Sequence, residues 1–245
     1  MDRNLQPVSV SGQRLPLPQA GGTLAREKNT VLRNTYWLLA LTMLPTIGGA
    51  LVGTQMNLAR VFAANPIMAP LIMFGVMMGG LFVVSALRNS AWGVAALFGF
   101  TFVAGVALTP ILTYAAGFAN GGQAVALAAG MTAVIFFALA GFATATKKDF
   151  SFMGKFLFIG LILLIVASLA NLFFQVPAMS LTISAVAVLL FSAFILHDVS
   201  RIVNGGETNY VMATLGIFLS IYNLFTSLLH LLLAFPQVVR AVAAA

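Results

Sequence analysis

The most telling absence in this sequence is the absence of charge. Asp, Glu, Lys and Arg together make up 7% of the 245 residues, and only five residues are acidic. A soluble globular domain carries about 25% charged residues. Hydrophobic residues, by contrast, reach 61%. A soluble domain is therefore excluded, and lipid is expected to be the main solvent of the folded chain.

Cysteine is missing altogether, which excludes a disulfide framework, a thiolate nucleophile and a cysteine-based metal site. The net charge of +7 would suit a nucleic-acid partner if the basic residues formed a patch. They are scattered between apolar runs instead. No nucleic-acid partner is therefore predicted.

Motifs of membrane-embedded enzymes are missing as well. The sequence contains no GxSG serine site, no GxGD aspartyl site and no HExxH metal site. Its two histidines, His197 and His230, fall on opposite sides of the predicted membrane and cannot share a metal ion. We therefore predict no enzymatic activity, no cofactor and no bound metal.

Long apolar runs dominate what is present. Each is near or above the roughly 20 residues that cross a hydrocarbon core of about 30 Å. Each must be helical, because open strand edges do not survive in lipid. Short connections predict antiparallel hairpins, so the expected fold is an all-α integral membrane protein with seven transmembrane helices. The runs are Tyr36–Gly53, Pro66–Leu87, Ala91–Tyr114, Ala124–Ala145, Met153–Phe174, Met179–Ile202 and Tyr210–Phe235.

The chain before the first run is polar and rich in proline and glycine. Residues 1–33 are therefore predicted to be a flexible basic tail. The membrane domain is placed at residues 34–236, and a short outer tail at residues 237–245. Within the domain, Pro45 and Pro110 are expected to bend their helices.

Basic residues are distributed unequally between the two sides of the predicted membrane. Ten lie on the side of the amino terminus and two on the other. The positive-inside rule then places the amino terminus in the cytoplasm and the carboxyl terminus outside. The ten are Arg3, Arg14, Arg26, Lys28, Arg33, Arg88, Lys147, Lys148, Lys155 and Arg201, and the two are Arg60 and Arg240.

Two runs carry stripes of small or polar residues on one helix face. In the third run Thr101, Gly105, Thr109 and Thr113 recur every four residues, which suits close helix packing. The seventh run carries the polar stripe Gly216, Ser220, Asn223, Ser227 and His230. A polar stripe in lipid must face protein or enclosed water, so the seventh helix is expected inside the bundle. The stripe serves either interhelical hydrogen bonds or a polar pathway, with His230 toward the outer side.

Asp198 is one of the few acids and lies near the end of the sixth run. It is three residues before Arg201, a spacing at which two side chains on a helix can form an ion pair. The alternative is an acid that faces the bundle interior and senses protons or lines a cation route. Gly205 and Gly206 are expected to stop this helix, and Thr208 or Asn209 to cap the next one.

Three segments together resemble the Bax inhibitor family of seven-helix membrane proteins. They are "ILHDVSRIVNGGETNYVMATLGIFLSIYNLFTSLL", "FGFTFVAGVALTPIL" and "TKKDFSFMGKFLF". The opening "VLRNTYWLL" and the loop "GGETNY" are similar to a bacterial branch of that family that modulates the FtsH protease. The resemblance implies three helix pairs around a central seventh helix, a bacterial plasma-membrane location, and a membrane-bound ATP-dependent protease of the FtsH type as partner.

The resemblance also implies a second function. Calcium-leak members of the family use two acids, on helices six and seven, as a proton-sensitive pair, and coupled carboxylates titrate as one unit. The first acid corresponds to Asp198, but the second corresponds to Ser220, which is not acidic. A latch arginine corresponds to the region of Arg88, a candidate partner of Asp198. A protease regulator is the first interpretation, and a proton-sensitive calcium or cation leak is the alternative.

The distribution of basic residues generates the first testable prediction. A reporter that is active only after export, fused behind Ala245, should be active, because an odd number of spans separates the two termini. Its activity is compared with that of a reporter active only in the cytoplasm at the same position. Activity of the cytoplasmic reporter there would refute seven spans with an internal amino terminus.

Overall fold

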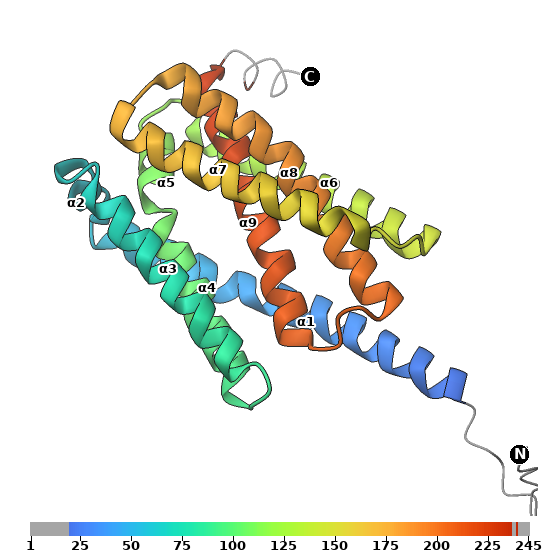
Figure 1. Cartoon of the computed structure of the whole chain (residues 1–245). Helices are drawn as coiled ribbons and strands as arrows, with labels where there is room; N and C mark the ends of the chain where they lie inside the picture. The colour runs from blue at the N-terminus through green and yellow to red at the C-terminus, as the bar shows by residue number, and fades with distance from the viewer. Residues whose placement is uncertain (1–19, 237–238, 240–245) are drawn as a thin grey trace, which may run out of the picture.

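The computed structural model describes residues 20–236 and 239, and these form a bundle of helices with no strand among them (Figure 1). Seven helical segments are long and apolar enough to cross a membrane. The expected all-α fold with seven spans is therefore confirmed. The helices are α1 Ala20–Gln55, α2 Leu58–Ala64, α3 Met68–Leu87, α4 Trp92–Ala107, α5 Thr109–Ala116, α6 Gly121–Thr146, α7 Gly154–Phe174, α8 Pro177–Asn204 and α9 Tyr210–Ala234.

Helix α1 begins well before the predicted boundary of the tail. Residues 20–33 are helical, so the expectation of a flexible segment up to residue 33 is wrong for this part. The cause is local: after Gly22 the sequence TLAREKN contains mainly good helix formers and runs into the first span without a break. Residues 1–19, and the outer tail apart from Val239, lie outside the described residues.

The length of α1 exceeds the thickness of a membrane. Its 36 residues correspond to about 54 Å at 1.5 Å per residue, against a hydrocarbon core of about 30 Å. The apolar span begins only at Asn29. The first turns of α1 therefore project from the bundle, and they lead toward the amino terminus (Figure 1).

The third span is interrupted where proline predicts a bend. Helix α4 ends at Ala107 and α5 begins at Thr109, with Pro110 in the first turn of α5. Proline fits there because its missing N–H would have no partner in a first turn. Helix α1 continues through Pro45.

Helix α9 is at the centre of the bundle, as the polar stripe predicts. It contacts α1, α3, α4, α5, α6 and α8. Half of its most apolar stretch is buried, compared with 6% for the corresponding stretches of α3 and α7. Helices α3 and α7 are consequently the ones that expose most surface to lipid.

The closest neighbours in the bundle are not always consecutive in the chain. Helix α1 packs mainly on α4, and α6 packs on α8 and α9. The first expected hairpin, α1 with α3, is connected through α2, and the two long helices have no direct contact in the described part of the chain. Short connections make consecutive helices antiparallel. Which helix faces pack together depends instead on where the small residues lie.

The α1–α4 contact is a crossing of two glycine-containing faces. A Cβ atom on Gly105 of α4 would overlap the Thr46 carbonyl of α1, and one on Gly49 of α1 would overlap the Phe102 carbonyl of α4. Thr101 and Thr109, from the predicted small-residue stripe, are fully buried at this crossing. Small residues thus let two backbones approach closely, as expected for membrane helices.

This crossing generates the second prediction. Gly105→Ala should lower the free energy of unfolding by about 1–3 kcal/mol, because the added methyl group has no space. Gly99→Ala is the matched control in the same helix, since a Cβ atom there meets nothing within 4 Å. Unfolding in mixed micelles, followed by circular dichroism, measures both. Equal stability of the two variants would show that the crossing is not tightly packed.

Candidate functional site

The candidate site lies where α8 ends and α9 begins. The chain turns at Gly205, whose φ of 80° is in the left-handed region, and Gly206 donates to the Arg201 carbonyl at 2.7 Å. The predicted stop of the sixth span at these glycines is confirmed. The Asn209 side chain caps α9 by accepting hydrogen bonds from the backbone N–H groups of Val211 and Met212 at 3.0 Å each. Of the two predicted capping residues, Asn209 is therefore the cap and Thr208 is not.

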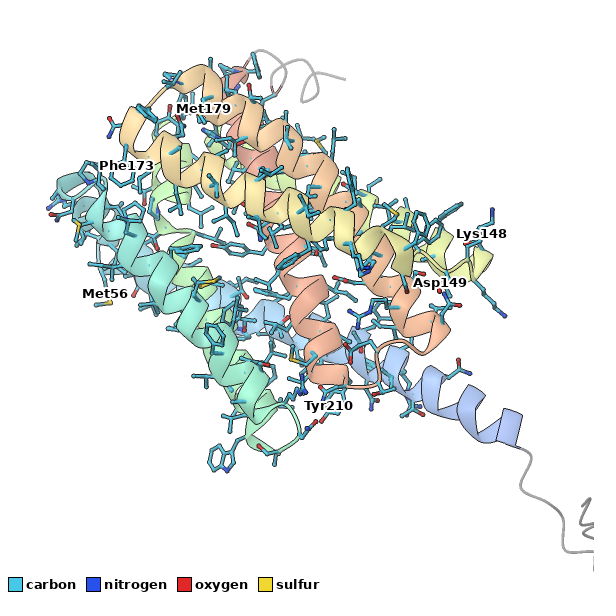
Figure 2. The ribbon with its side chains drawn as sticks, in the orientation of Figure 1. Met56, Lys148, Asp149, Phe173, Met179 and Tyr210 are labelled. Carbon is cyan, nitrogen blue, oxygen red and sulfur yellow. The ribbon has the colours of Figure 1, made fainter. Side chains whose placement is uncertain are left out.

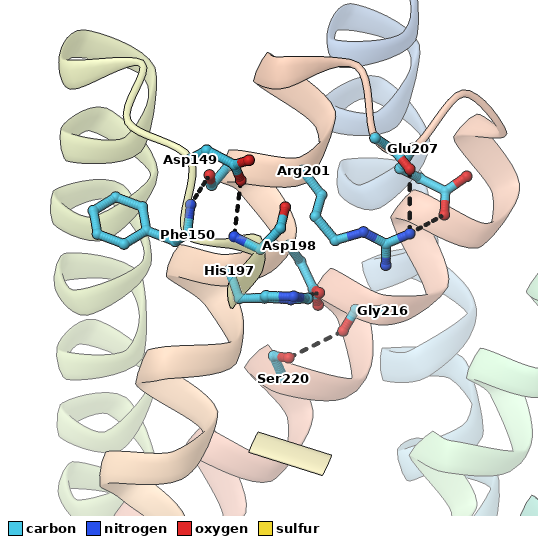
Figure 3. Close-up of polar contacts among 11 residues, drawn as sticks. Asp149, Phe150, His197, Asp198, Arg201, Glu207, Gly216 and Ser220 are labelled. Carbon is cyan, nitrogen blue, oxygen red and sulfur yellow. Dashed lines mark hydrogen bonds and ion pairs between the residues drawn. The ribbon is translucent and has the colours of Figure 1, made fainter. Parts of the chain in front are cut away.

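Asp198 pairs with its neighbour His197 and not with an arginine. The distance from His197 Nδ1 to Asp198 Oδ1 is 3.0 Å, and the two side chains are 9% and 17% exposed. The expected ion pair of Asp198 with Arg201 is not formed. Arg201 turns instead toward the α8–α9 loop, where its guanidinium donates to Glu207 at 3.4 Å and to the Gly206 carbonyl at 3.3 Å (Figure 3).

Arg88, the other candidate partner, takes part through its backbone. Its carbonyl accepts a hydrogen bond from Asn209 Nδ2 at 3.0 Å, and Asn89 accepts a second one at 2.9 Å. The Arg88 side chain is exposed and forms no ion pair with a described residue, Asp198 included. The α3–α4 connection is therefore fixed to the start of α9, but without the predicted charge pair.

A cavity of about 450 Å³ lies between α3, α8 and α9 and brings Asp198, Arg201 and Glu207 together. Its other walls are largely apolar and include Met78, Leu81, Phe82, Met212 and Leu219. From the sequence, Glu207 was given no place in the site. Its position after a glycine turn that reverses the chain is the signal that could have brought it into the site.

The Asp198 carboxylate faces the central helix. Its Oδ2 atom lies 3.1 Å from the position that a Cβ atom on Gly216 would occupy. One turn further, buried Ser220 donates to the Gly216 carbonyl at 3.1 Å (Figure 3). Gly216 thus leaves the space that the carboxylate uses, and Ser220 is satisfied within its own helix.

The rest of the polar stripe is also bonded mainly within α9. Asn223 donates to the Leu219 carbonyl at 2.8 Å, and Ser227 is largely buried. Of the five stripe residues, only His230 forms a side-chain hydrogen bond to another described helix, with its Nδ1 atom 2.8 Å from Ser184 Oγ of α8. The stripe therefore contributes one cross-helix bond near the opposite end of the bundle, and not a continuous chain of hydrogen bonds from Asp198.

Ser200, two residues after Asp198, holds the α6–α7 connection against α8. Its hydroxyl donates to the Lys148 carbonyl at 2.9 Å and accepts from the Phe150 N–H at 3.0 Å, and the residue is fully buried. In the same loop, Asp149 accepts from the Ser151 N–H at 2.8 Å. Hydrogen bonds from Ser151 lower the pKa of the Asp149 carboxyl, so this exposed acid stays ionised at neutral pH.

The site has the chemistry of a charged pocket at one end of the bundle. Two carboxylates, one guanidinium and one imidazole lie at or beside the cavity, and each carboxylate has a basic partner. Among the described residues no group of three or more His, Asp or Glu could hold a metal ion. The arrangement thus places compensated charges beside an otherwise largely apolar cavity.

Comparison with known proteins identifies related chains. Residues 28–237 match the sequence model of a family described as "Inhibitor of apoptosis-promoting Bax1". The matched region begins at the membrane-spanning part of α1 and includes all seven spans. The candidate cavity lies entirely within it.

Individual relatives are similar over most of their length. An uncharacterized protein of Pseudomonas aeruginosa is 43% identical over 206 residues, which is 84% of this chain and 90% of that protein. The "Modulator of FtsH protease YccA" of Escherichia coli K12 is 39% identical over 203 residues, 82% of this chain and 89% of that protein. A relative from Escherichia coli O6:H1 with the same identity is named an inner membrane protein.

Proposed function

The chain belongs to the family of inhibitors of apoptosis-promoting Bax1, and we propose that it is a non-enzymatic regulator that binds and modulates a membrane-bound protease of the FtsH type. The carrying observation is the similarity to a protein named as a modulator of that protease, at 39% identity over 89% of its length. At this coverage the two chains share the membrane domain as a whole.

The location that fits this role is the bacterial inner membrane, with the amino terminus in the cytoplasm. A relative carries the name of an inner membrane protein. Lys148, Asp149 and Tyr210 lie toward one end of the bundle, and Met56, Phe173 and Met179 lie at the other (Figure 2). The basic connections are thus collected at the end from which α1 projects, which supports a cytoplasmic assignment for that end.

The projecting part of α1 supports a role for the amino-terminal segment in contact with the protease. Residues 20–28 continue the helix beyond the apolar span and carry Arg26 and Lys28. This helical extension lies beyond the apolar span, where a partner on the cytoplasmic side can contact it. We infer that residues 1–28 are offered to the protease on the cytoplasmic side, where an ATP-dependent protease can engage a chain end.

The prediction from this arrangement uses a truncation at the structural boundary. Removing residues 1–28 should leave the bundle inserted, because the span starts at Asn29 and Val31 and Leu32 still pack on the core. It should weaken modulation of the protease, measured as the degradation rate of a membrane substrate in proteoliposomes. The control is a full-length chain in which four basic residues are changed to Gln: Arg3, Arg14, Arg26 and Lys28. It separates the effect of losing charge from the effect of losing the segment. Unchanged modulation by the truncated chain would exclude a role for this segment.

A second candidate function is a proton-sensitive cation leak, and one observation favours it. The Asp198 carboxylate has a free oxygen against Gly216 of the central helix and lines the cavity at the basic end. A titratable acid facing the interior of a membrane bundle suits an ion route. The position equivalent to the second acid holds Ser220, so this route lacks a coupled carboxylate pair.

The fourth prediction separates the leak from a regulator without conduction. Wild type should show weak cation flux in liposomes that depends little on pH. Ser220→Asp should gain pH dependence, because a second carboxylate near Asp198 would share a proton with it. Asp198→Asn in that background should remove the dependence. Strong acid-sensitive calcium flux in the wild type would show that one carboxylate is sufficient and would reverse the order of the two functions.

A further inference from the structure

The charged cavity between α3, α8 and α9 changes character along its length. Its charged residues Asp198, Arg201 and Glu207 lie toward the end of α8, whereas Met78 and Leu219 line it further in. The 28 residues of α8 extend about 42 Å, which matches the roughly 40–45 Å of a bilayer with its headgroups. The cavity is therefore polar at the level of the headgroups and apolar below that level.

The Asp198 carboxylate lies where these two levels meet. Asp198 is six residues before Asn204, the last residue of α8, which corresponds to about 9 Å along the axis. The polar layer on each side of the hydrocarbon core is roughly 5–8 Å thick. Met78 and Leu219 are each nine residues from the same end of their helices, or about 14 Å. The cavity thus continues about one helical turn beyond the carboxylate, into the hydrocarbon.

The cavity opens to lipid between α3 and α8. Helix α3 has α2, α4 and α9 as neighbours, and α8 is not among its neighbours in the described part of the chain. The first turns of α9 lie between the ends of α3 and α8 (Figure 1). Phe82 of α3 lines the cavity although it is 75% exposed. A molecule dissolved in the membrane can therefore enter from the side.

One acceptor of the cavity has no partner among the described residues. His197 holds Asp198 Oδ1 at 3.0 Å, and no described residue forms a hydrogen bond with Oδ2. Glu207, by contrast, uses both of its oxygens, accepting from the Asn209 N–H at 3.0 Å and from Arg201 at 3.4 Å. A carboxylate oxygen at the edge of the hydrocarbon is costly without a donor. The acid left for a ligand is therefore Asp198.

The charges and the walls of the cavity decide which chemistry fits it. Two carboxylates and one guanidinium line it, which disfavours an anion. Calcium requires about six to eight oxygen ligands, and no group of three or more acids and histidines among the described residues could hold a metal ion. A purely apolar molecule would leave the open oxygen without a donor. A protonated amine on an apolar body meets both requirements, because its N–H groups donate to the carboxylate and its body covers the walls.

We propose that this cavity binds an amphiphilic amine taken up from the membrane, an inference that is independent of protease regulation. The ammonium group donates to Asp198 Oδ2, and the apolar body lies between α3 and α9 against Met78 and Leu219. The cavity volume of about 450 Å³ is within the roughly 300–1000 Å³ of small-molecule sites. An alkyl chain too long for the cavity continues past Phe82 into the lipid.

A pair of photoactivatable probes tests the class of ligand. Dodecylamine and dodecanoic acid, each with a diazirine near the middle of its chain, are crosslinked to the purified full-length protein in micelles. Mass spectrometry identifies the labelled peptides. The amine should label the cavity residues of α3 and α9 at least tenfold more than the acid does, with saturation and with competition by unlabelled dodecylamine. Equal labelling by the two probes, or labelling that does not saturate, would overturn the proposal.

A pair of acid variants tests the group that binds the amine. Asp198→Asn removes the negative charge, keeps the size of the side chain, and should reduce labelling by the amine at least tenfold. Asp149→Asn is the matched control, because Asp149 is an exposed acid at the same end of the bundle and does not line the cavity (Figure 2). Undiminished labelling of the Asp198→Asn chain would show that the carboxylate does not bind the amine.

A pair of tryptophan variants tests the apolar end independently. Met78→Trp should fill the space beneath the carboxylate and reduce labelling at least tenfold. Val76→Trp should have no effect, because Val76 is 50% exposed on the same helix and does not line the cavity. Equal labelling of the two variants would place the amine elsewhere and refute the site. If Asp198→Asn does not fold, the two probes and this pair still decide, and none of these measurements involves the protease.

Discussion

Hydrocarbon offers no hydrogen-bond partner, and the rest of this structure depends on that constraint. Every backbone N–H and C=O within the membrane must be satisfied by the chain itself, so each apolar run becomes a helix. The same constraint acts on side chains. Hydroxyl groups in the spans, among them Thr42, Thr132 and Ser192, donate to carbonyls three or four residues earlier in their own helix. Polar residues are thereby accommodated without a requirement for a polar neighbour.

Since the lipid is as apolar as the helix surfaces, burial of apolar area does not by itself decide which helices meet. Close packing decides it instead. Gly49 and Gly105 bring α1 and α4 together, whereas α1 and α6 meet through long side chains, with the rings of Tyr36 and Phe136 6.2 Å apart. Small residues thus permit the closest approach of two backbones, and larger side chains hold other helices further apart.

Charge is kept at the end of the bundle, where it can be paired or hydrated. Asp198 is held by His197, and Arg201 by Glu207, so the acids of the cavity are compensated although they lie next to apolar walls. Ser200 and Asn209 attach the neighbouring connections to this end. The charged cavity therefore lies at the α8–α9 end of the bundle, where its ion pairs compensate the acids beside largely apolar walls.

What the sequence by itself determined is the class of the protein, its seven spans and the central position of the last helix. The class and the spans follow from the hydrophobicity of stretches of about 20 residues, in which one unusual residue changes little. The central position of the last helix follows from the spacing of polar residues along one helix face. The start of α1 was placed too late because proline and glycine in the first 22 residues suggested an irregular segment up to residue 33, whereas α1 begins at Ala20. The glycine stop of α8 and the Asn209 cap were readable because both are local.

Only the tertiary structure decided which helices touch, which base holds Asp198 and which acid joins it in the cavity. Arg201 is one turn from Asp198 on the same helix, yet it turns to Glu207 because the chain reverses at Gly205 and brings that carboxylate within 3.4 Å. Likewise, only the structure shows that α1 packs mainly on α4 and that α6 packs on α8 and α9. Such contacts depend on the distance between backbones far apart in the chain, and residue spacing along one helix carries no information about that distance.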